Sequence, residues 1–251
     1  MAGDFKDLFS SRPDAYARYR PGYPAEAFAW LAAQASSLRL AIDVGTGNGQ
    51  AALGLAAHFE HVLGLDPSEA QLANAREHPR VAYRVSRAEQ LAADDASADA
   101  IFVAQALHWF DHDAFFAEVR RVLAPRGVLA VSCYQLSQIA PAIDAIVMEL
   151  YHDYLDAYWE PERKLVETGY RTIEFPFPEL PAPEFDMRLS WTLDDLIGYL
   201  GTWSPLKRFR NERGFDPLDA IVPKLRAAWG DAPERTVVWP FTVRGFRASS
   251  A

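Results

Sequence analysis

The chain has 251 residues, half of them hydrophobic, which is enough for one α/β domain with an insertion or a small cap. Its formal net charge of -9 at pH 7 argues against a nucleic-acid partner, because phosphate contacts need clustered Lys and Arg. The single cysteine, Cys133, excludes an intrachain disulfide and fits a reducing cytoplasm, and no apolar run approaches the ~20 residues of a membrane span. We therefore expect a cytoplasmic protein whose partners include neither nucleic acid nor membrane.

Residues 1–37 form an aromatic arm and a helix. The arm contains the string Tyr16-Ala17-Arg18-Tyr19-Arg20-Pro21-Gly22-Tyr23-Pro24, whose prolines break any helix. Two roles remain open for the arm. It is either an aromatic plug at the edge of the domain or a cover over a ligand, contacted by Tyr19 and Arg20, whose guanidinium could bind a carboxylate. Pro24 then predicts the start of a helix that reaches Ala35.

The apolar run 38–44 predicts a buried strand, and a glycine-rich turn and a helix follow it. The turn reads Asp43-Val44-Gly45-Thr46-Gly47-Asn48-Gly49-Gln50, and its glycines allow bare backbone to approach a ligand. The dinucleotide fingerprint G-x-G-x-x-G needs glycine at position 50, where this chain has Gln. The Asp43 carboxylate would repel a pyrophosphate but could accept hydrogen bonds from an ammonium. We therefore expect a ligand with a positive amino group near this turn.

A second acidic residue follows the next predicted strand. The apolar run 62–65 ends at Asp66, at the distance along the chain where an acid typically binds ribose hydroxyls. Pro67 and Ser68 lead into a third helix, and Ser68 with Gln71 forms a capping-box pattern. Ser68 can therefore cap that helix, contact the ribose, or both.

These two motifs together resemble the class I S-adenosylmethionine-dependent methyltransferases. The resemblance implies that the first motif holds the methionine part of S-adenosylmethionine and that Asp66 binds its ribose, with Pro67 and Ser68 alongside. The first-motif residues are Asp43, Gly45, Thr46, Gly47 and Gly49. The implied fold is a doubly wound, mostly parallel seven-stranded α/β sheet of the Rossmann-like methyltransferase type. The tyrosine and proline string of the arm resembles the type 11 methyltransferases and, within them, the trans-aconitate methyltransferase subgroup.

The loop after the third predicted strand, 81–85, is where related methyltransferases line the adenine. Here that loop contains Arg87, Ala88 and Glu89 as candidate contacts. An amide donor at Ala88 or Glu89 could meet a ring nitrogen. Many relatives carry Asp at Ser86 or Arg87, so the group that takes the exocyclic amine stays open, as does an ordinary strand–helix loop.

The fourth predicted strand, 100–104, ends at the string Gln105-Ala106-Leu107-His108-Trp109. Ligands of open parallel sheets bind beyond the carboxyl ends of the strands, so Gln105, Ala106 and Trp109 are expected near the transferred methyl. His108 is a candidate general base, with a pocket-lining hydrogen bonder as the alternative. We expect no metal site here, because Asp111 is better placed as a helix cap than as a ligand and a sulfonium needs no Lewis acid.

The sequence predicts one methyltransferase domain with the cofactor core in 38–134, a cap insertion in 135–233 and a closing antiparallel strand in 234–251. An acidic acceptor would need a cationic side chain in the cap, where Arg208, Arg210 and Arg171 are candidates, unless they form a solvated basic face. The cap is rich in aromatic side chains: Tyr151, Tyr154, Tyr158, Trp159, Trp191, Tyr199 and Trp203.

The expected function is S-adenosylmethionine-dependent methyl transfer to a small-molecule acceptor. The subgroup resemblance suggests a carboxylic acid as that acceptor. Two alternatives remain open at this point: a cofactor-binding Rossmann-like module without activity, and a NAD-dependent dehydrogenase. The oligomeric state is left open as well.

Overall fold

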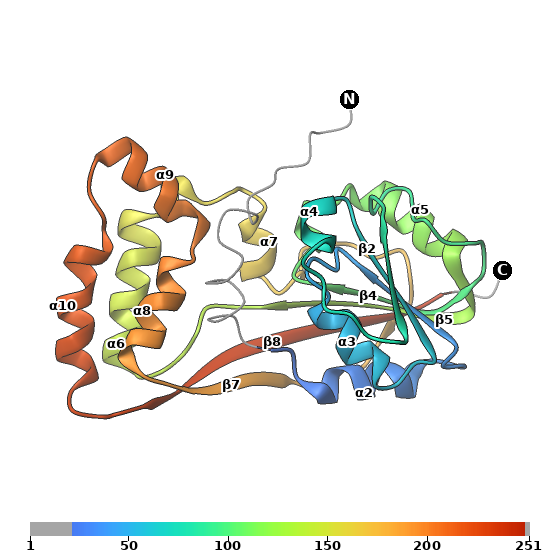
Figure 1. The fold of residues 1–251 in the computed structure, drawn as a ribbon, viewed down its shortest axis with the longest axis horizontal. Helices are drawn as coiled ribbons and strands as arrows, with labels where there is room; N and C mark the ends of the chain where they lie inside the picture. Colours follow the sequence, from blue (N-terminus) through green and yellow to red (C-terminus); the bar gives the residue numbers. More distant parts are fainter. Residues whose placement is uncertain (1–21, 249–251) are drawn as a thin grey trace.

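The computed structural model describes residues 22–248, and one eight-stranded sheet runs through them (Figure 1). The strand order is β3-β2-β1-β4-β5-β8-β6, with β7 also paired to β8. The first five strands are mutually parallel and β8 is antiparallel to its partners. The strands are β1 Leu40–Val44, β2 His61–Asp66, β3 Val81–Val85, β4 Ala98–Ala104, β5 Leu123–Tyr134, β6 Glu179–Leu180, β7 Phe185–Trp191 and β8 Arg235–Arg247.

The doubly wound, mostly parallel α/β class and the antiparallel closing strand are confirmed, but the predicted count of seven strands is wrong. The described residues contain eight strands because β8 is 13 residues long and finds three partners. Residues 241–247 of β8 pair with β5, and residues 245–246 pair with β6. The other end of β8, residues 235–241, continues beyond the parallel strands and pairs with β7.

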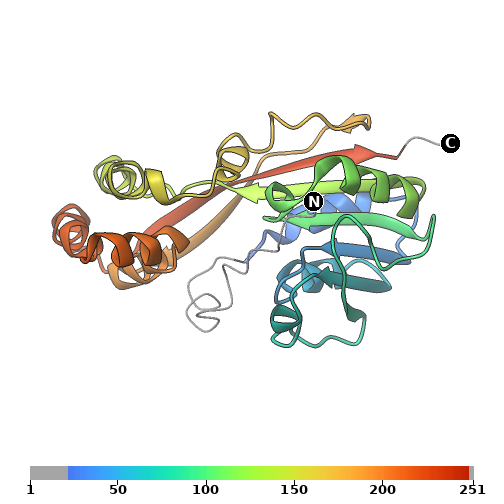
Figure 2. The same cartoon turned by 90° about the horizontal axis from the view of Figure 1, so that it is seen from above.

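Helices cover both faces of the sheet (Figure 2). Because strand side chains alternate, Phe102 of β4 joins the core under α2 and α3, whereas Ile101 and Val103 join the core under α5. The helical segments are α2 Ala25–Gln34, α3 Gln50–Ala56, α4 Glu69–Leu72, η1 Leu107–Trp109, α5 His112–Val122, α6 Pro141–Met148, η2 Glu149–Tyr154, η3 Asp156–Tyr158, α7 Arg163–Glu167, α8 Leu193–Gly201, α9 Ser204–Arg213 and α10 Leu218–Trp229.

Side-chain caps fix several of the helix starts. Asp111 accepts a hydrogen bond from the Ala114 amide at 3.2 Å, so its predicted role as the cap of α5 is confirmed. Thr192 and Asp195 form a capping box at the start of α8. Ser204 begins α9, which has a proline in its first turn, where a missing amide costs nothing.

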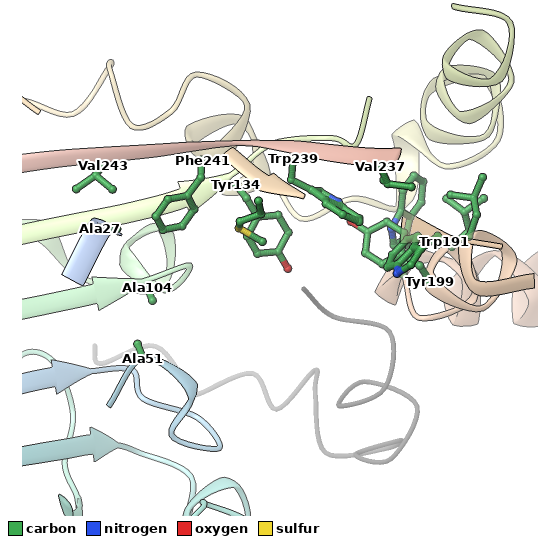
Figure 3. Packing of buried hydrophobic residues seen from close by; sticks show 14 of the residues in the cluster. Ala27, Ala51, Ala104, Tyr134, Trp191, Tyr199, Val237, Trp239, Phe241 and Val243 are labelled. Atoms are coloured by element: carbon green, nitrogen blue, oxygen red, sulfur yellow. The ribbon is translucent and has the colours of Figure 1, made fainter. Parts of the chain in front are cut away.

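The cap consists of α6, α8, α9 and α10, which lie beyond the end of the parallel strands (Figure 1). One hydrophobic cluster runs from the core under α2 into this cap along β8. Figure 3 shows Phe241, Tyr134 and Trp239 following one another along β8 toward Trp191 and Tyr199, and the Trp191 and Trp239 ring centroids are 4.7 Å apart. Continuous aromatic packing along β8 therefore holds the cap on the sheet.

Within residues 22–248, every helix is too short or too polar to cross a lipid bilayer.

Candidate active site

The sheet reverses its winding between β1 and β4, so the crevice beyond the carboxyl ends of these strands is where an α/β sheet of this type binds ligands. The glycine turn lies there, directly after β1. Gly45, Gly47 and Gly49 all have left-handed backbone, with φ of 73°, 54° and 84°. The amides of Gly45 and Thr46 both donate to the carbonyl of Leu65 at 2.8 and 3.0 Å, which ties the turn to β2.

The three glycines face different surroundings. A Cβ added at Gly45 would lie 2.6 Å from the Cβ of Ala106, and one at Gly49 would lie 2.1 Å from the hydroxyl of Tyr83. At Gly47 the nearest atom is Oε1 of Gln71, 4.0 Å away. Gly45 and Gly49 are thus required for packing, whereas among residues 22–248 no atom fills the space above Gly47, which is therefore open to a ligand.

Asp43 lies beneath this turn and is fully buried. Its Oδ2 accepts a hydrogen bond from the Thr46 hydroxyl at 2.6 Å, but no group of residues 22–248 donates to its Oδ1. Burial raises the pKa of Asp43 from 3.8 to about 7, against the opposing effects of the Thr46 hydrogen bond and of the nearby Ala52 amide, which lies outside hydrogen-bond geometry with Oδ1. A buried acceptor without a donor is costly, and an ammonium ligand would supply what it lacks.

Asp66 ends β2 and lies beside the glycine turn, as the pairing of β1 with β2 requires. Its Oδ2 accepts from the Gly47 amide at 2.9 Å and its Oδ1 accepts from the Ser68 amide at 2.9 Å. These two amide hydrogen bonds fix the orientation of the carboxylate. Ser68 also accepts from the Gln71 amide at 3.3 Å, so its predicted capping role is confirmed.

The loop after β3 is anchored to the start of α5. Glu89 accepts from the Asp111 amide at 3.1 Å and pairs with Arg87 at 3.4 Å. Ala88 is buried, and neither its amide nor that of Glu89 donates a hydrogen bond within residues 22–248. These two amides are available to acceptors such as adenine ring nitrogens.

At the end of β4, Gln105 has a left-handed backbone with φ of 54°, which is uncommon for a residue other than glycine. Its amide donates to the Ser132 carbonyl at 2.8 Å, and its side-chain oxygen accepts from the Tyr134 amide at 2.9 Å. Both the backbone amide and the side-chain amide of Gln105 are therefore hydrogen-bonded to β5. Ala106, the next residue, packs against the turn beside Gly45.

His108 is 9% exposed, and its Nδ1 lies 3.0 Å from the Tyr170 hydroxyl. Its ring also packs on Trp109, with centroids 4.7 Å apart. Burial lowers the pKa of His108 to about 3, and the charges of Arg163 and His112 lower it further in the same direction. At neutral pH the imidazole is uncharged and its proton affinity is weak. Within residues 22–248, His, Cys, Asp and Glu side chains form no group of three suited to a metal ion.

Comparisons with known proteins agree with this geometry. The family described as a methyltransferase domain matches residues 42–131. A Dictyostelium discoideum protein described as a methyltransferase is 36% identical over 229 residues, which cover 90% of this chain and 87% of that protein. The chain belongs to the methyltransferase family.

Two further relatives of this methyltransferase are informative. A solved structure from Anaeromyxobacter dehalogenans, described as a type II methyltransferase, is 48% identical and has a TM-score of 0.87, covering 92% of this chain and 99% of that one. The trans-aconitate 2-methyltransferase of Variovorax paradoxus is 38% identical over 94 residues, or 36% of each chain. The first likeness extends over the core and the cap, whereas the second is partial.

The structure of the methyltransferase brings most of the sequence-predicted residues to one edge of the sheet. The turn after β1, Asp66 to Ser68, the loop after β3 and Gln105 to Trp109 all follow carboxyl ends of parallel strands. Tyr19 and Arg20 lie outside the described residues, so their predicted contacts are not addressed. Gln105 uses its side chain within the protein, which leaves less of it for a ligand than the sequence suggested.

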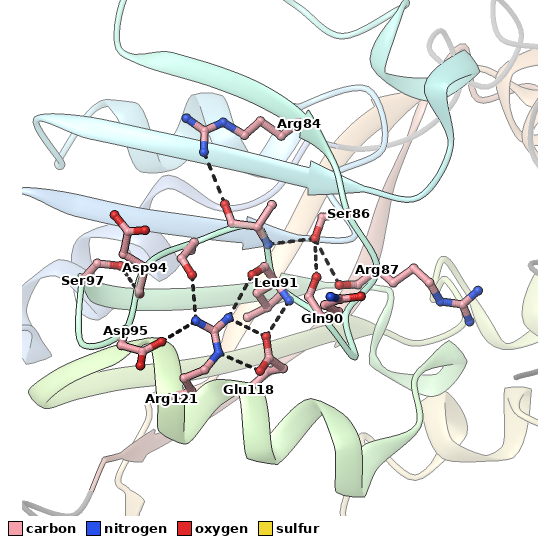
Figure 4. Close-up of polar contacts among 12 residues, drawn as sticks. Arg84, Ser86, Arg87, Gln90, Leu91, Asp94, Asp95, Ser97, Glu118 and Arg121 are labelled. Carbon is pink, nitrogen blue, oxygen red and sulfur yellow. Dashed lines mark hydrogen bonds and ion pairs between the residues drawn. The ribbon is translucent and has the colours of Figure 1, made fainter.

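Sequence reasoning missed Arg121 of α5, which clamps the loop after β3 (Figure 4). Its guanidinium donates to the carbonyls of Leu91 and Ala93 at 2.9 and 2.8 Å and pairs with Glu118 and Asp95 at 2.6 and 2.7 Å. Glu118 in turn accepts from the Leu91 amide at 2.7 Å, and its pKa is lowered mainly by the Arg121 hydrogen bond. The only sequence signal was the spacing of Glu118 and Arg121, which fits any exposed helical pair.

Proposed function

We propose that this methyltransferase takes its methyl group from S-adenosylmethionine and transfers it to a small molecule, with a carboxylic acid as the preferred acceptor. When bound, the cofactor would supply a sulfonium methyl whose carbon bonds to the acceptor while the electron pair of the broken bond stays on sulfur. The observation that carries the proposal is the unpaired, buried Oδ1 of Asp43 beside the open space at Gly47. An ammonium group at this turn matches both features.

The remaining contacts follow from the same edge of the sheet. The Asp66 carboxylate, oriented by the Gly47 and Ser68 amides, would accept hydrogen bonds from the ribose diol. The amides of Ala88 and Glu89 would meet the adenine. The segment from Gln105 to Trp109 would border the methyl, and the chain must hold the acceptor atom roughly 3 Å from the methyl carbon and in line with its bond to sulfur.

His108 is proposed as a wall of this pocket rather than as its base. A base that works at neutral pH needs a pKa near 7, whereas burial, together with the charges of Arg163 and His112, leaves His108 with a pKa of about 3. A carboxylate acceptor is already anionic at neutral pH and requires no base. The partial similarity to a trans-aconitate 2-methyltransferase supports that acceptor class.

Calorimetry tests the cofactor. S-adenosylhomocysteine is expected to bind the wild-type protein, whereas NADH is not, because Gln50 and Asp43 both disfavour a pyrophosphate at the turn. Membership in the methyltransferase family already counts against the dehydrogenase alternative. Tight binding of NADH with no response to S-adenosylhomocysteine would end the proposal.

Methyl transfer from labelled S-adenosylmethionine tests the acceptor. We expect label to enter small carboxylic acids and not the matching amides, which lack an anionic oxygen. Transfer to phenols or amines alone would redirect the proposal from an acid to a base-requiring acceptor. No transfer to any acceptor in the panel would favour a cofactor-binding module without activity.

The role of His108 is tested with His108→Asn, which retains a polar atom near the position of Nδ1. We expect turnover to fall by less than about tenfold, because a wall residue contributes no proton transfer, whereas loss of a general base typically slows turnover at least ~100-fold. A pH–rate profile checks this: a wall residue leaves its shape unchanged. A ~100-fold loss that flattens the acidic limb of the profile, where a general base becomes protonated, would restore His108 as the base.

A further inference from the structure

Arg163 begins α7, a short helix of the cap-forming segment that packs beside η1, the segment carrying His108. Figure 1 shows α7 between the cap helices and the carboxyl ends of the parallel strands. Arg163 is partly buried there. A guanidinium at this place is next to the edge where the transferred methyl is expected.

Aromatic groups hold Arg163 on one side. Its Nε donates to the Tyr151 hydroxyl at 3.2 Å, and its guanidinium carbon lies 5.2 Å from the Trp159 ring centroid and 5.8 Å from that of Tyr151. The two rings themselves pack with centroids 4.7 Å apart. Cation–π contacts and one hydrogen bond thus orient the guanidinium while leaving its terminal nitrogens for another partner.

Three other arginines of the cap are paired with acids, whereas Arg171 and Arg226 are exposed to solvent. Arg208 pairs with Glu160, Arg210 pairs with Asp216 at 2.6 Å, and Arg213 lies 3.5 Å from Glu212. In residues 22–248, by contrast, no Asp or Glu lies within ion-pair distance of Arg163, and its terminal nitrogens donate to no acceptor.

Glu167, one helical turn after Arg163, does not supply the missing charge. Its carboxylate accepts a hydrogen bond from the Tyr151 hydroxyl instead, so that Tyr151 lies between the two. A partly buried cation without a counter-ion is unfavourable, and an anionic ligand would relieve it.

The field of Arg163 reaches the end of β4 and β5. Its charge contributes to the lowered pKa of His108 and opposes the burial that raises the pKa of the Cys133 thiol. It also opposes the burial that raises the pKa of Tyr170. These three groups come from η1, β5 and the segment after α7, so the positive charge faces the expected site of methyl transfer.

We propose that Arg163 binds a carboxylate of the methyl acceptor, through terminal nitrogens that the aromatic pair Tyr151 and Trp159 keeps oriented and unpaired. This assignment rests on the proposed function, because it places the acceptor beside the donor methyl. It names the substrate class as small carboxylic acids and replaces Arg208 and Arg210, which have acidic partners of their own. The carboxylate of the cofactor has the same chemistry, so the test separates the two sources.

The first part of the test measures cofactor binding. S-adenosylhomocysteine is titrated into wild-type protein, Arg163→Gln and, as the matched control, Arg226→Gln, an exposed arginine of α10 in the same cap. The Kd of S-adenosylhomocysteine is expected to stay within about twofold of the wild-type value in both variants, because Arg163 binds the acceptor and not the cofactor. A large loss of affinity in Arg163→Gln alone would assign Arg163 to the carboxylate of the cofactor and overturn the proposal.

The second part uses protein saturated with S-adenosylhomocysteine and two probes, trans-aconitate and benzoate. Wild-type protein is expected to bind at least one of them, Arg163→Gln to bind it about 10- to 100-fold more weakly, and Arg226→Gln to be unchanged, since charge-assisted hydrogen bonds are lost only in the first. Arg163→Lys keeps the charge and much of the packing, so its affinity for the acid is expected to lie between those of wild-type protein and Arg163→Gln. It serves as the reporter if the Gln variant does not fold.

The outcomes separate the two proposals. Failure of wild-type protein to bind S-adenosylhomocysteine would reject the proposed function itself. Normal cofactor binding with no response to either acid, or equal binding of the acid by wild-type protein and the Arg163 variants, would reject only the role of Arg163.

Discussion

The cofactor half and the cap build their polar contacts differently. Around the glycine turn the partners are backbone groups or near neighbours, such as Thr46 with Asp43 three residues away and Gly47 with Asp66 19 residues away. In the cap, the partners are side chains that meet across long stretches, such as Tyr158 with Glu212 54 residues away. A strand–turn–helix pattern specifies the first kind of site locally, whereas the second depends on how several helices pack.

This difference predicts that the two regions respond differently to substitution. The turn after β1 depends on backbone geometry that only glycine adopts freely, whereas the aromatic cluster of the cap depends on side-chain volume. The largest effects of small substitutions are therefore expected in the turn.

Gly45→Ala is expected to have the largest effect. The new Cβ would lie 2.6 Å from the Cβ of Ala106 in a left-handed backbone, so we expect a loss of about 3–5 kcal/mol in unfolding free energy together with cofactor binding. Gly214→Ala, in the cap, is the matched control, because Gly214 has a φ of 75° with nothing within 4 Å. It should cost only about 1 kcal/mol of backbone strain. Equal losses in urea unfolding would refute the contrast.

Asp66→Ala comes next. It removes the acceptor of the Gly47 and Ser68 amides as well as the proposed ribose ligand, so the affinity for S-adenosylhomocysteine should fall by about 1.5–3 kcal/mol. Calorimetry measures this, with Asp186→Ala on β7 as the control, since Asp186 pairs only with the nearby Arg188 at the surface of the described structure. Unchanged affinity in Asp66→Ala would remove this carboxylate from the site.

Much of the cofactor half could be predicted from the sequence, because its site is specified by local strand–turn patterns. Gly45→Ala and Asp66→Ala test these patterns. Asp43, the glycines and Asp66 follow apolar strand runs, and parallel pairing of β1 with β2 is enough to bring them together. The caps Asp111 and Thr192 were equally local.

The partners that involve the rest of the chain were not predictable in this way. His108 contacts Tyr170, which is 62 residues away in the sequence, and the side chain of Gln105 accepts a hydrogen bond from Tyr134, which is 29 residues away. No periodicity encodes such pairs, because they arise from the path of the cap segment over the end of β4. The strand that was not predicted is β6, because its two residues, Glu179 and Leu180, form a strand only through their pairing with residues 245–246 of β8.

Arg121→Met sharpens the comparison when it is measured beside Arg244→Met, because Arg244 of β8 holds the segment after α7 in the same way. Arg244 donates to the Tyr170 carbonyl at 2.6 Å and pairs with Glu179 at 2.8 Å, as Arg121 does with Leu91 and Glu118. Both Met variants should lose about 1–2 kcal/mol of stability, because buried carbonyls lose their donors. Only Arg121→Met should weaken S-adenosylhomocysteine binding, by about fivefold, since it loosens the adenine loop. Equal cofactor affinity in both variants would show that the loop after β3 does not contact the ligand.

Asp43→Asn is expected to have the smallest effect on stability. Unlike the preceding variants, it should stabilise the folded protein. The folded-state pKa of Asp43, about 7, lies above the ordinary value of 3.8 for an aspartate. Between these pH values the folded protein binds one more proton than the unfolded chain, so stability falls as pH rises from about 4 to 7 and then levels off. Asn carries no charge, so its burial avoids the cost of burying a carboxylate, although the contact with Thr46 is lost. We therefore expect a net gain of about 1 kcal/mol in unfolding free energy at pH 8 and no gain below pH 4.

The same substitution should weaken S-adenosylhomocysteine binding, because an amide pairs poorly with an ammonium. Wild-type affinity should also rise as the pH passes through about 7 and Asp43 ionises, whereas the variant should show no such rise. Thermal unfolding and calorimetry across this range measure both effects. A variant that is less stable than wild type at pH 8 but binds the cofactor normally would show that Asp43 supports the turn without contacting the ligand. A variant that is more stable and binds weakly would show that this turn gives up stability for binding.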